Sequence, residues 1–170
     1  IVGGGPIGLL TSLAAQACGA GAVIVVEPVE ARRDAAASEG ALGTDPDSAT
    51  QLVRQVTDER GADLVVDAVG GPNGLADALK LVRRRGIVVS VGFHLDQSWP
   101  LPIATAFADE LTLRFVIGDF MRDADELISL VRAGAIDPTM VASETVPLKS
   151  AADAYQRMAE RRTLKSLIRP

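Results

Sequence analysis

A glycine-rich turn at the start of the chain contains the residues most suited to chemistry. Gly3, Gly5 and Gly8 fit the pattern G-x-G-x-x-G, and Pro6 lies between the last two. The first glycine of this pattern allows a tight turn out of a strand, the second lets a pyrophosphate approach the backbone, and the third permits close packing of helix on strand. Proline is favourable at the start of a helix, whose free N–H groups and positive dipole end attract phosphates. The turn therefore predicts a dinucleotide-binding site.

A carboxylate follows this turn at the distance along the chain that such a site requires. Glu27 ends an apolar run about 20 positions after Gly8. There it can accept hydrogen bonds from both ribose hydroxyls of an adenosine, and it would repel a 2′-phosphate by roughly 1 to 4 kcal/mol at about 4 Å. We therefore predict a preference for NAD over NADP. Arg32 and Arg33 leave two alternatives: they form a solvated helix face, or Arg32 reaches back over the adenosine.

The remaining sequence alternates short apolar runs with amphipathic stretches. Apolar residues at helical spacing predict helices over 6–18, 29–39, 47–59, 74–84, 103–109, 123–133 and 150–162. Apolar runs predict buried strands over 22–27, 63–69 and 87–91, and extended segments over 111–117, 143–148 and 164–168; residues 94–102 form an irregular connection. This alternation predicts an α/β fold, a doubly wound parallel sheet (Rossmann fold) with helices on both faces. Its ligands would lie at the carboxyl ends of the strands.

A few residues are suited to helix ends. Gly40 and Gly86 are placed to end the second and fourth predicted helices. The run Arg83–Arg85 would complement the dipole at the end of that fourth helix. Asp123 is suited to cap the helix over 123–133.

Composition excludes several classes of protein. The 170 residues, 48% hydrophobic and 23% charged, suit one soluble globular domain or slightly more. A net charge of -5 without a basic block argues against nucleic-acid and anionic-membrane surfaces, and no apolar run is long enough for a transmembrane helix. One Cys and one His exclude an internal disulfide and a Cys/His zinc site. We expect Cys18 to be buried, and His94 to be a surface-loop residue rather than a pocket-lining one.

Several segments, in order along essentially the whole chain, resemble the coenzyme-binding domain of zinc-dependent medium-chain dehydrogenases/reductases. The segments that carry the resemblance are Gly3–Leu10, Gly19-Ala20, the strand ending in Glu27, Gly61–Gly70, Arg85–Gly92, Ile136–Pro138, Val146–Leu148 and Ala151–Tyr155. Quinone-reductase-like relatives tend to lack the first glycine of the fingerprint. Gly3 therefore favours the alcohol and polyol dehydrogenase branch.

The resemblance implies a coenzyme site made by several loops. It implies that Gly3, Gly5, Pro6, Ile7 and Gly8 cradle the pyrophosphate, with Ile7 against the nicotinamide, and that Glu27 holds the adenosine ribose with Arg32 beside it. Ala68 and Val69 would lie along the cofactor. The segment Val91, Gly92, Phe93 and the backbone near Val116 and Ile117 would meet the nicotinamide carboxamide, and Lys165 would contact a phosphate.

The family's catalytic zinc and structural zinc belong to an N-terminal domain that nothing in this sequence matches. We therefore expect no catalytic residue and no metal ligand in this chain, and we expect the isolated chain to bind NAD(H) weakly and to oxidise no alcohol. The start at Ile1, without Met, suggests a cut inside the first strand. Residues 1–148 would form the NAD-binding domain. Residues 149–170 would form a helix and a strand that return toward the catalytic domain.

Three expectations concern partners and alternatives. The resemblance implies a homodimer through the edge strand near 111–117, because an exposed sheet edge must be covered or paired. A cytoplasmic location is expected. A stand-alone nucleotide-sensing domain and a methyltransferase remain alternatives, since both can use a glycine-rich first turn.

Overall fold

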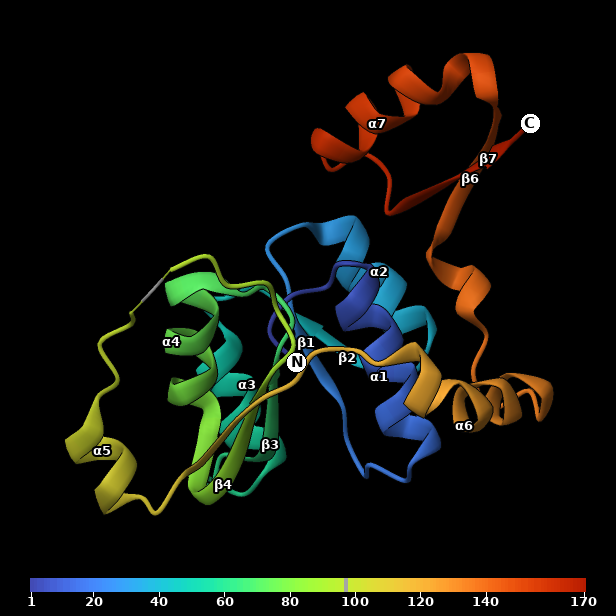
Figure 1. The fold of residues 1–170 in the computed structure, drawn as a ribbon. Helices are drawn as coiled ribbons and strands as arrows, with labels where there is room; N and C mark the ends of the chain where they lie inside the picture. Colours follow the sequence, from blue (N-terminus) through green and yellow to red (C-terminus); the bar gives the residue numbers. More distant parts are fainter. Residues whose placement is uncertain (97) are drawn as a thin grey trace.

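The computed structural model describes residues 1–96 and 98–170 (Figure 1). Its main sheet is parallel and contains β1 (Ile24–Val26), β2 (Leu42–Thr44), β3 (Ala62–Asp67), β4 (Val82–Ser90) and β5 (Thr112–Phe115). Val2 makes parallel bridges to Val26 and to Asp67, so the order across the sheet is β2, β1, Val2, β3, β4, β5. The order reverses at Val2. The doubly wound parallel sheet predicted from the sequence is therefore confirmed.

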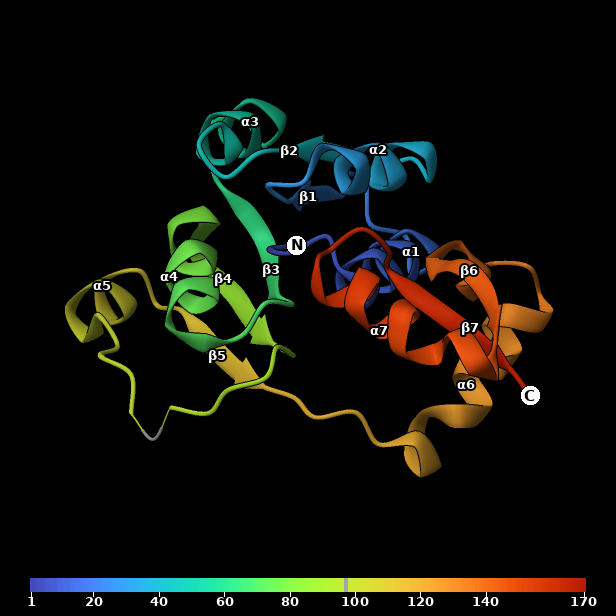
Figure 2. The ribbon, with the colours of Figure 1, turned by 90° about the horizontal axis from the view of Figure 1, so that it is seen from above.

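Helices cover both faces of this sheet. α1 (Pro6–Ala17) and α2 (Glu30–Ser38) pack on one face; α3 (Ala49–Val56), α4 (Gly71–Leu81) and the short α5 (Ile103–Ala108) lie on the other (Figure 2). Neighbouring β1 residues point to opposite faces, as in any strand. Val25 is buried with Leu9 of α1, and Val26 with Val53 of α3 and Ala78 of α4. The sheet is thus buried on both sides, which explains its continuous apolar runs.

Among residues 1–96 and 98–170, Val2 is the residue that bridges the β1–β2 pair to the β3–β4–β5 sheet. Its N–H donates to the carbonyl of Val66 at 2.8 Å, and its own carbonyl accepts from Ala68 at 2.9 Å. A groove beside it is lined by residues of β1 and β3, among them Ile24 and Leu64. Val2 therefore fixes the spacing of the two strand ends on either side of the glycine-rich turn.

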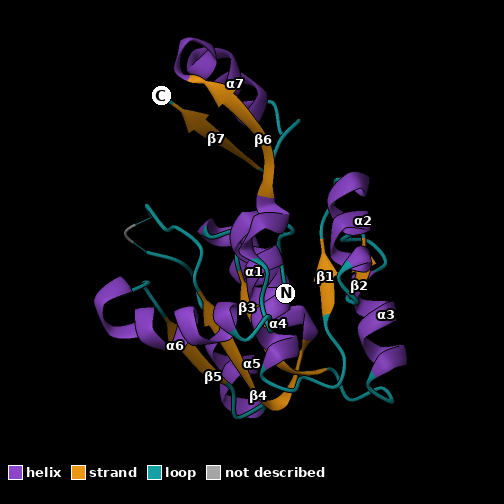
Figure 3. Cartoon of the chain, turned by 90° about the vertical axis from the view of Figure 1, so that its right-hand side faces the viewer, coloured by secondary structure: helices purple, strands orange, loops and turns teal. Residues whose placement is uncertain are grey.

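The last part of the chain forms a separate small sheet. After α6 (Phe120–Arg132) and η1 (Pro138–Val141), β6 (Ala142–Pro147) pairs in parallel with β7 (Lys165–Arg169), and η2 (Leu148–Ser150) and α7 (Ala151–Ala159) connect them. Figure 3 shows β6, β7 and α7 standing away from the main sheet. Glu144 of β6 ties the unit together, because it accepts hydrogen bonds from Arg157 of α7 and Ser166 of β7. These contacts hold the pKa of Glu144 below its usual value.

The junction of α4 and β4 was predicted wrongly, and β2 was not predicted. The helix predicted over 74–84 lies at 71–81, and Val82 already pairs with Ala62 in the sheet. Gly86 is therefore inside β4 rather than after a helix. The arginines do not serve a helix end: the side chain of Arg83 donates to Asp63 at 2.5 Å, and that of Arg84 to Glu110 at 3.3 Å. β2 was missed because only Thr44 of its three residues is buried.

Three local expectations have clear outcomes. Gly40 follows α2 with φ of 86°, as predicted for a left-handed helix end. Cys18 is exposed rather than buried, because it is the C-cap residue of α1. α6 begins three residues before the prediction. Its N-cap is Asp119, whose carboxylate accepts from the N–H of Arg122, so Asp123 lies within the first turn.

Candidate functional site

The three fingerprint glycines do different jobs in the first turn. Gly3 has φ of 99°, and a Cβ there would lie 2.8 Å from Cγ2 of Val69. A Cβ on Gly8 would overlap the carbonyl oxygen of Gly3, so only glycine lets α1 pack this close to the turn. A Cβ on Gly5 would meet no protein atom within 4 Å. Gly3 and Gly8 are therefore required by the fold, and Gly5 faces open space.

The N-terminus of α1 opens onto the same space. Gly5 is its N-cap and Pro6 its first residue, and no side chain caps it. Among the described residues, the N–H groups of Gly5, Ile7 and Gly8 have no hydrogen-bond partner. Helix N-termini carry a partial positive charge, and unpaired N–H groups there bind anions well. The start of α1 thus presents unpaired N–H donors to the space in front of Gly5.

Glu27 lies at the end of β1 beside this turn, with only 4% of its surface exposed. Its Oε2 accepts from the N–H of Gly4 at 2.8 Å, and its Oε1 accepts from the N–H of Val29 at 3.0 Å. A carboxylate can accept about four hydrogen bonds, so about two positions stay open for hydroxyl donors. Glu27 therefore also holds the glycine-rich turn against the end of β1 through the hydrogen bond from Gly4. The sequence did not indicate this structural role.

The two arginines after β1 are placed differently. Arg32 lies beside Glu27, with Nη1 3.9 Å from Oε2 and 17% of its side chain exposed. Arg33 donates from Nη1 to the carbonyls of Glu27 and Pro28, at 2.9 and 2.8 Å. Arg32 is therefore no freely solvated side chain, and its cation is next to the carboxylate that would meet the ribose.

The other predicted residues of the main sheet lie at the same carboxyl edge. The N–H groups of Val91 and Gly92 donate to the carbonyl of Asp67, and that of Val116 donates to the carbonyl of Ser90. The loop after β4 is thus bonded to the end of β3, and the loop after β5 to the end of β4. The residues that these loops and the first turn expose there are Ile7, Val69, Phe93, Val116 and Ile117. Ala68 lies at the same edge, because its N–H donates to the carbonyl of Val2. Lys165 is exposed at the start of β7, in the other sheet.

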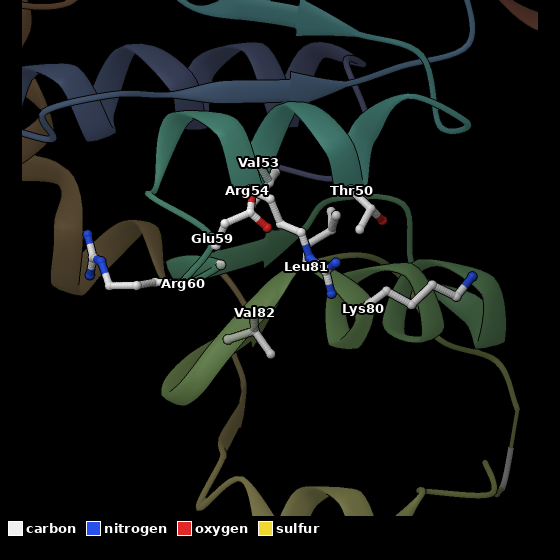
Figure 4. Close-up of a pocket in the computed structure, with 9 residues that line it drawn as sticks. Thr50, Val53, Arg54, Glu59, Arg60, Lys80, Leu81 and Val82 are labelled. Carbon is white, nitrogen blue, oxygen red and sulfur yellow. The ribbon is translucent and has the colours of Figure 1, made fainter.

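One pocket lies at the opposite edge of the sheet (Figure 4). It is lined by residues at the end of α3, the loop before β3 and the end of α4, including Arg54, Glu59 and Lys80. Its position at the amino ends of the strands separates it from every predicted nucleotide contact.

The structure also reveals a polar cluster that the sequence did not indicate. Asp67 is fully buried at the end of β3, and Ser90 is buried at the end of β4. His94, expected on a surface loop, has 24% of its side chain exposed, and its Nε2 lies 2.7 Å from Oγ of Ser90. Part of this cluster could have been found from the sequence. Asp67 and Ser90 end neighbouring strands, and carboxyl ends of parallel strands meet at one edge.

Comparison with known proteins agrees with this geometry. Residues 6–133 match the family model described as zinc-binding dehydrogenase. A probable zinc-binding alcohol dehydrogenase of Mycobacterium tuberculosis is 37% identical over 155 residues, which cover 91% of this chain and 40% of that protein. A sorbitol dehydrogenase of Bacillus subtilis is 29% identical, over 92% of this chain and 45% of its own.

Solved structures give the same result. An alcohol dehydrogenase from Thermus sp. ATN1 has a TM-score of 0.91 and 31% identity, and the match covers 99% of this chain and 50% of that one. The chain therefore spans about half the length of the relatives that it matches. Together the match to the family model, the identities and the shared fold establish that the chain belongs to the zinc-binding dehydrogenase family, and that it corresponds to the nucleotide-binding half of such proteins.

Proposed function

We propose that the chain binds NAD(H) at the carboxyl edge of its main sheet. It would serve as the coenzyme half of an enzyme that moves hydride between an alcohol or polyol and NAD. The observation that carries this proposal is the open space in front of Gly5, bounded by uncapped N–H groups of α1 and by Glu27. An alcohol dehydrogenase of E. coli with a similar fold has been solved with NADH. Such a coenzyme supplies the hydride acceptor, which no side chain can provide.

Each part of the edge has a separate task in this proposal. The N–H groups at the start of α1 bind the pyrophosphate, and Gly5 leaves room for it. The open positions on Glu27 accept hydrogen bonds from the adenosine ribose. Ala68 and Val69 lie along the cofactor, and the backbone of Val91, Gly92 and Phe93, with Val116 and Ile117, orients the nicotinamide carboxamide. Ile7 packs against the nicotinamide ring, and Lys165 supplies a phosphate contact from the second sheet.

Glu27 favours NAD over NADP in this proposal. Its carboxylate is held by two backbone N–H groups, so it cannot turn away from a 2′-phosphate. The neighbouring Arg32 offsets part of the repulsion, since opposite charges at about 4 Å attract by roughly 1 to 4 kcal/mol near a protein surface. We therefore expect a moderate preference rather than exclusion of NADP.

The remaining parts of the enzyme would lie outside these residues. The zinc, which stabilises a developing alkoxide, and its ligands would belong to a catalytic domain, so residues 1–170 alone would not oxidise an alcohol. Residues 149–170, together with the paired β6, would face that domain, and residues 1–148 would hold the coenzyme. β5 would pair with its counterpart in a homodimer located in the cytoplasm. No helix among residues 1–96 and 98–170 is both long and apolar enough to cross a bilayer.

Substitution of Gly5 by Val tests the proposal directly. Gly5 has φ of -74°, which valine adopts without strain, and the added Cβ would meet no protein atom within 4 Å. The N-cap change costs about 1 kcal/mol of stability. NADH binding, measured by fluorescence titration, should weaken at least about a hundredfold, since a branched side chain would occupy the pyrophosphate position.

The matched control is Gly21→Val, a second glycine whose added Cβ would meet nothing, in the loop before β1. It should leave NADH binding unchanged. Equal NADH affinity in Gly5→Val and the wild type would refute the proposed site.

A further inference from the structure

A chain of hydrogen bonds joins the loops after β3 and β4. Ser90 Oγ donates to Oδ2 of Asp67 at 2.7 Å, and His94 Nε2 lies 2.7 Å from Ser90 Oγ. On the other side of the ring, the N–H of Gly71 donates to Nδ1 of His94 at 3.1 Å. Oδ1 of Asp67 accepts from the N–H groups of Val69 and Gly70. The cluster thus connects the ends of two strands with the first residue of α4.

The donors and acceptors fix the protonation of the ring. Nδ1 accepts from a backbone N–H, so it carries no proton. The single proton of the neutral imidazole is therefore on Nε2, which donates to Ser90 Oγ, and the Ser90 hydroxyl then donates to the Asp67 carboxylate. Every link has one donor and one acceptor. This arrangement holds the imidazole in one tautomer and one orientation.

The two loops that this cluster connects also pack backbone against backbone. A Cβ on Gly70 would overlap the backbone of Phe93, and a Cβ on Gly92 would overlap the N–H of Gly70. His94 directly follows this contact, and its ring also packs edge-on against Phe115, with centroids 5.7 Å apart. It is therefore the side chain that fastens the loop carrying Gly92 and Phe93 to the start of α4.

We propose that His94 is a positioning residue for the coenzyme: by accepting from Gly71 and donating to Ser90, its imidazole fixes the backbone of Gly92 and Phe93 where the nicotinamide carboxamide is to bind. This inference rests on the proposed function. His94 would not touch the coenzyme itself. It would act through the loop after β4, adding to the bonds that Val91 and Gly92 donate to the carbonyl of Asp67.

Two variants separate the ring from its hydrogen bonds. In His94→Phe the ring keeps its contact with Phe115 but leaves the Gly71 N–H without an acceptor. In His94→Asn a side-chain oxygen can again accept from Gly71. NADH affinity should fall about tenfold in the first variant and recover to within about threefold of the wild type in the second. Leu95→Ala is the matched control, since Leu95 is the next residue and is 82% exposed.

A second measurement does not depend on any ligand. His94 is the only histidine, so its imidazole ¹⁵N resonances are unambiguous. They should show protonated Nε2 and unprotonated Nδ1, and amide exchange at Gly71 should accelerate in His94→Phe and be restored in His94→Asn. Thermal unfolding of each variant verifies that it is folded.

The outcomes are distinguishable. Faster Gly71 exchange together with weaker NADH binding, both restored by Asn, supports the inference. Faster exchange with unchanged NADH affinity overturns the positioning role and leaves NAD(H) binding intact. A wild-type protein that binds no NADH refutes the proposed function, and with it the positioning role, even where the exchange data show that His94 holds Gly71.

Discussion

Two turns in this molecule have nearly the same sequence, but they differ in what accepts hydrogen bonds from the N–H groups at the start of the helix. Both run through glycines and a proline into a helix, Val2–Gly8 into α1 and Val69–Gly74 into α4. In the first turn the N–H groups at the helix start are unpaired among the described residues, and Gly5 faces open space. In the second, Asp67 accepts from Gly70 and His94 accepts from Gly71. The two turns therefore differ at one N–H group: that of Gly5 is unpaired among the described residues, whereas its counterpart at Gly71 donates to a side chain of the protein.

This difference shows what a glycine-proline pattern can and cannot indicate. The pattern provides N–H groups at a helix start, which need an acceptor. Whether that acceptor is a ligand or a side chain depends on residues elsewhere in the chain, here a histidine after β4. A carboxylate accompanies each turn as well, Glu27 beside the first and Asp67 beside the second. Their surroundings decide which one can meet a ligand.

The largest effect that we expect concerns the last glycine of each turn. Gly8→Ala places a methyl group on the carbonyl oxygen of Gly3, which cannot move without breaking the turn. The free energy of unfolding should fall by about 3 kcal/mol. Gly74→Ala places a methyl group on Oδ1 of Asp67, a side-chain atom that can shift only by weakening its bonds to Val69 and Gly70, so the loss should be about 2 kcal/mol.

Urea unfolding of both variants provides the measurement, with Gly21→Ala as a control in open space. An equal loss in the two variants would mean that the turns are packed alike, contrary to the comparison.

Neutralising each carboxylate should give an equal or smaller loss of stability and separate the two turns by function. Asp67→Asn removes a charge that accepts three hydrogen bonds, from Val69, Gly70 and Ser90, in a fully buried position. We expect a loss of about 3 kcal/mol in unfolding free energy. Glu27→Gln disturbs two backbone bonds and should cost about 1 to 2 kcal/mol, but it should weaken NADH binding about tenfold.

Unfolding free energies and NADH affinities of the two variants, measured side by side, test this division. A larger loss of stability in Glu27→Gln than in Asp67→Asn would contradict it.

Sequence patterns predicted most of the fold because both faces of the sheet are covered. Buried strands read as continuous apolar runs, and the helices keep a clear apolar face, as Leu75 and Ala78 show in α4. The pattern failed where burial is slight, as in β2, and where a helix passes directly into a strand at Val82. There the apolar residue fits both periods, and pairing with Ala62 decides.

The candidate site could be predicted only where its residues lie close together in the sequence. A local pattern was sufficient to predict the conformation of the first turn, because Gly3, Gly5 and Gly8 are separated by only a few residues. The cluster of Asp67, Ser90 and His94 is drawn from the ends of two strands 23 residues apart. No local spacing encodes such a contact. Only the parallel register of β3 and β4, which pairs Asp67 with Ser90, brings it about.

The smallest expected effect concerns the cation that only the first turn has. Arg32 lies 3.9 Å from Glu27, whereas the neighbour of Asp67 is the imidazole of His94, whose Nδ1 accepts from Gly71. Arg32→Ala removes attraction for a 2′-phosphate and leaves Glu27 unopposed, so the NAD over NADP preference should rise about threefold to fivefold. Glu27→Ala should lower it, since the repelling charge is gone. Affinities for both coenzymes in the wild type and the two variants provide the test at low ionic strength, because salt screens exposed charges. A wild type that binds NADP more tightly than NAD would show that Arg32, and not Glu27, governs the ribose position, and the first turn would then select its ligand by a cation.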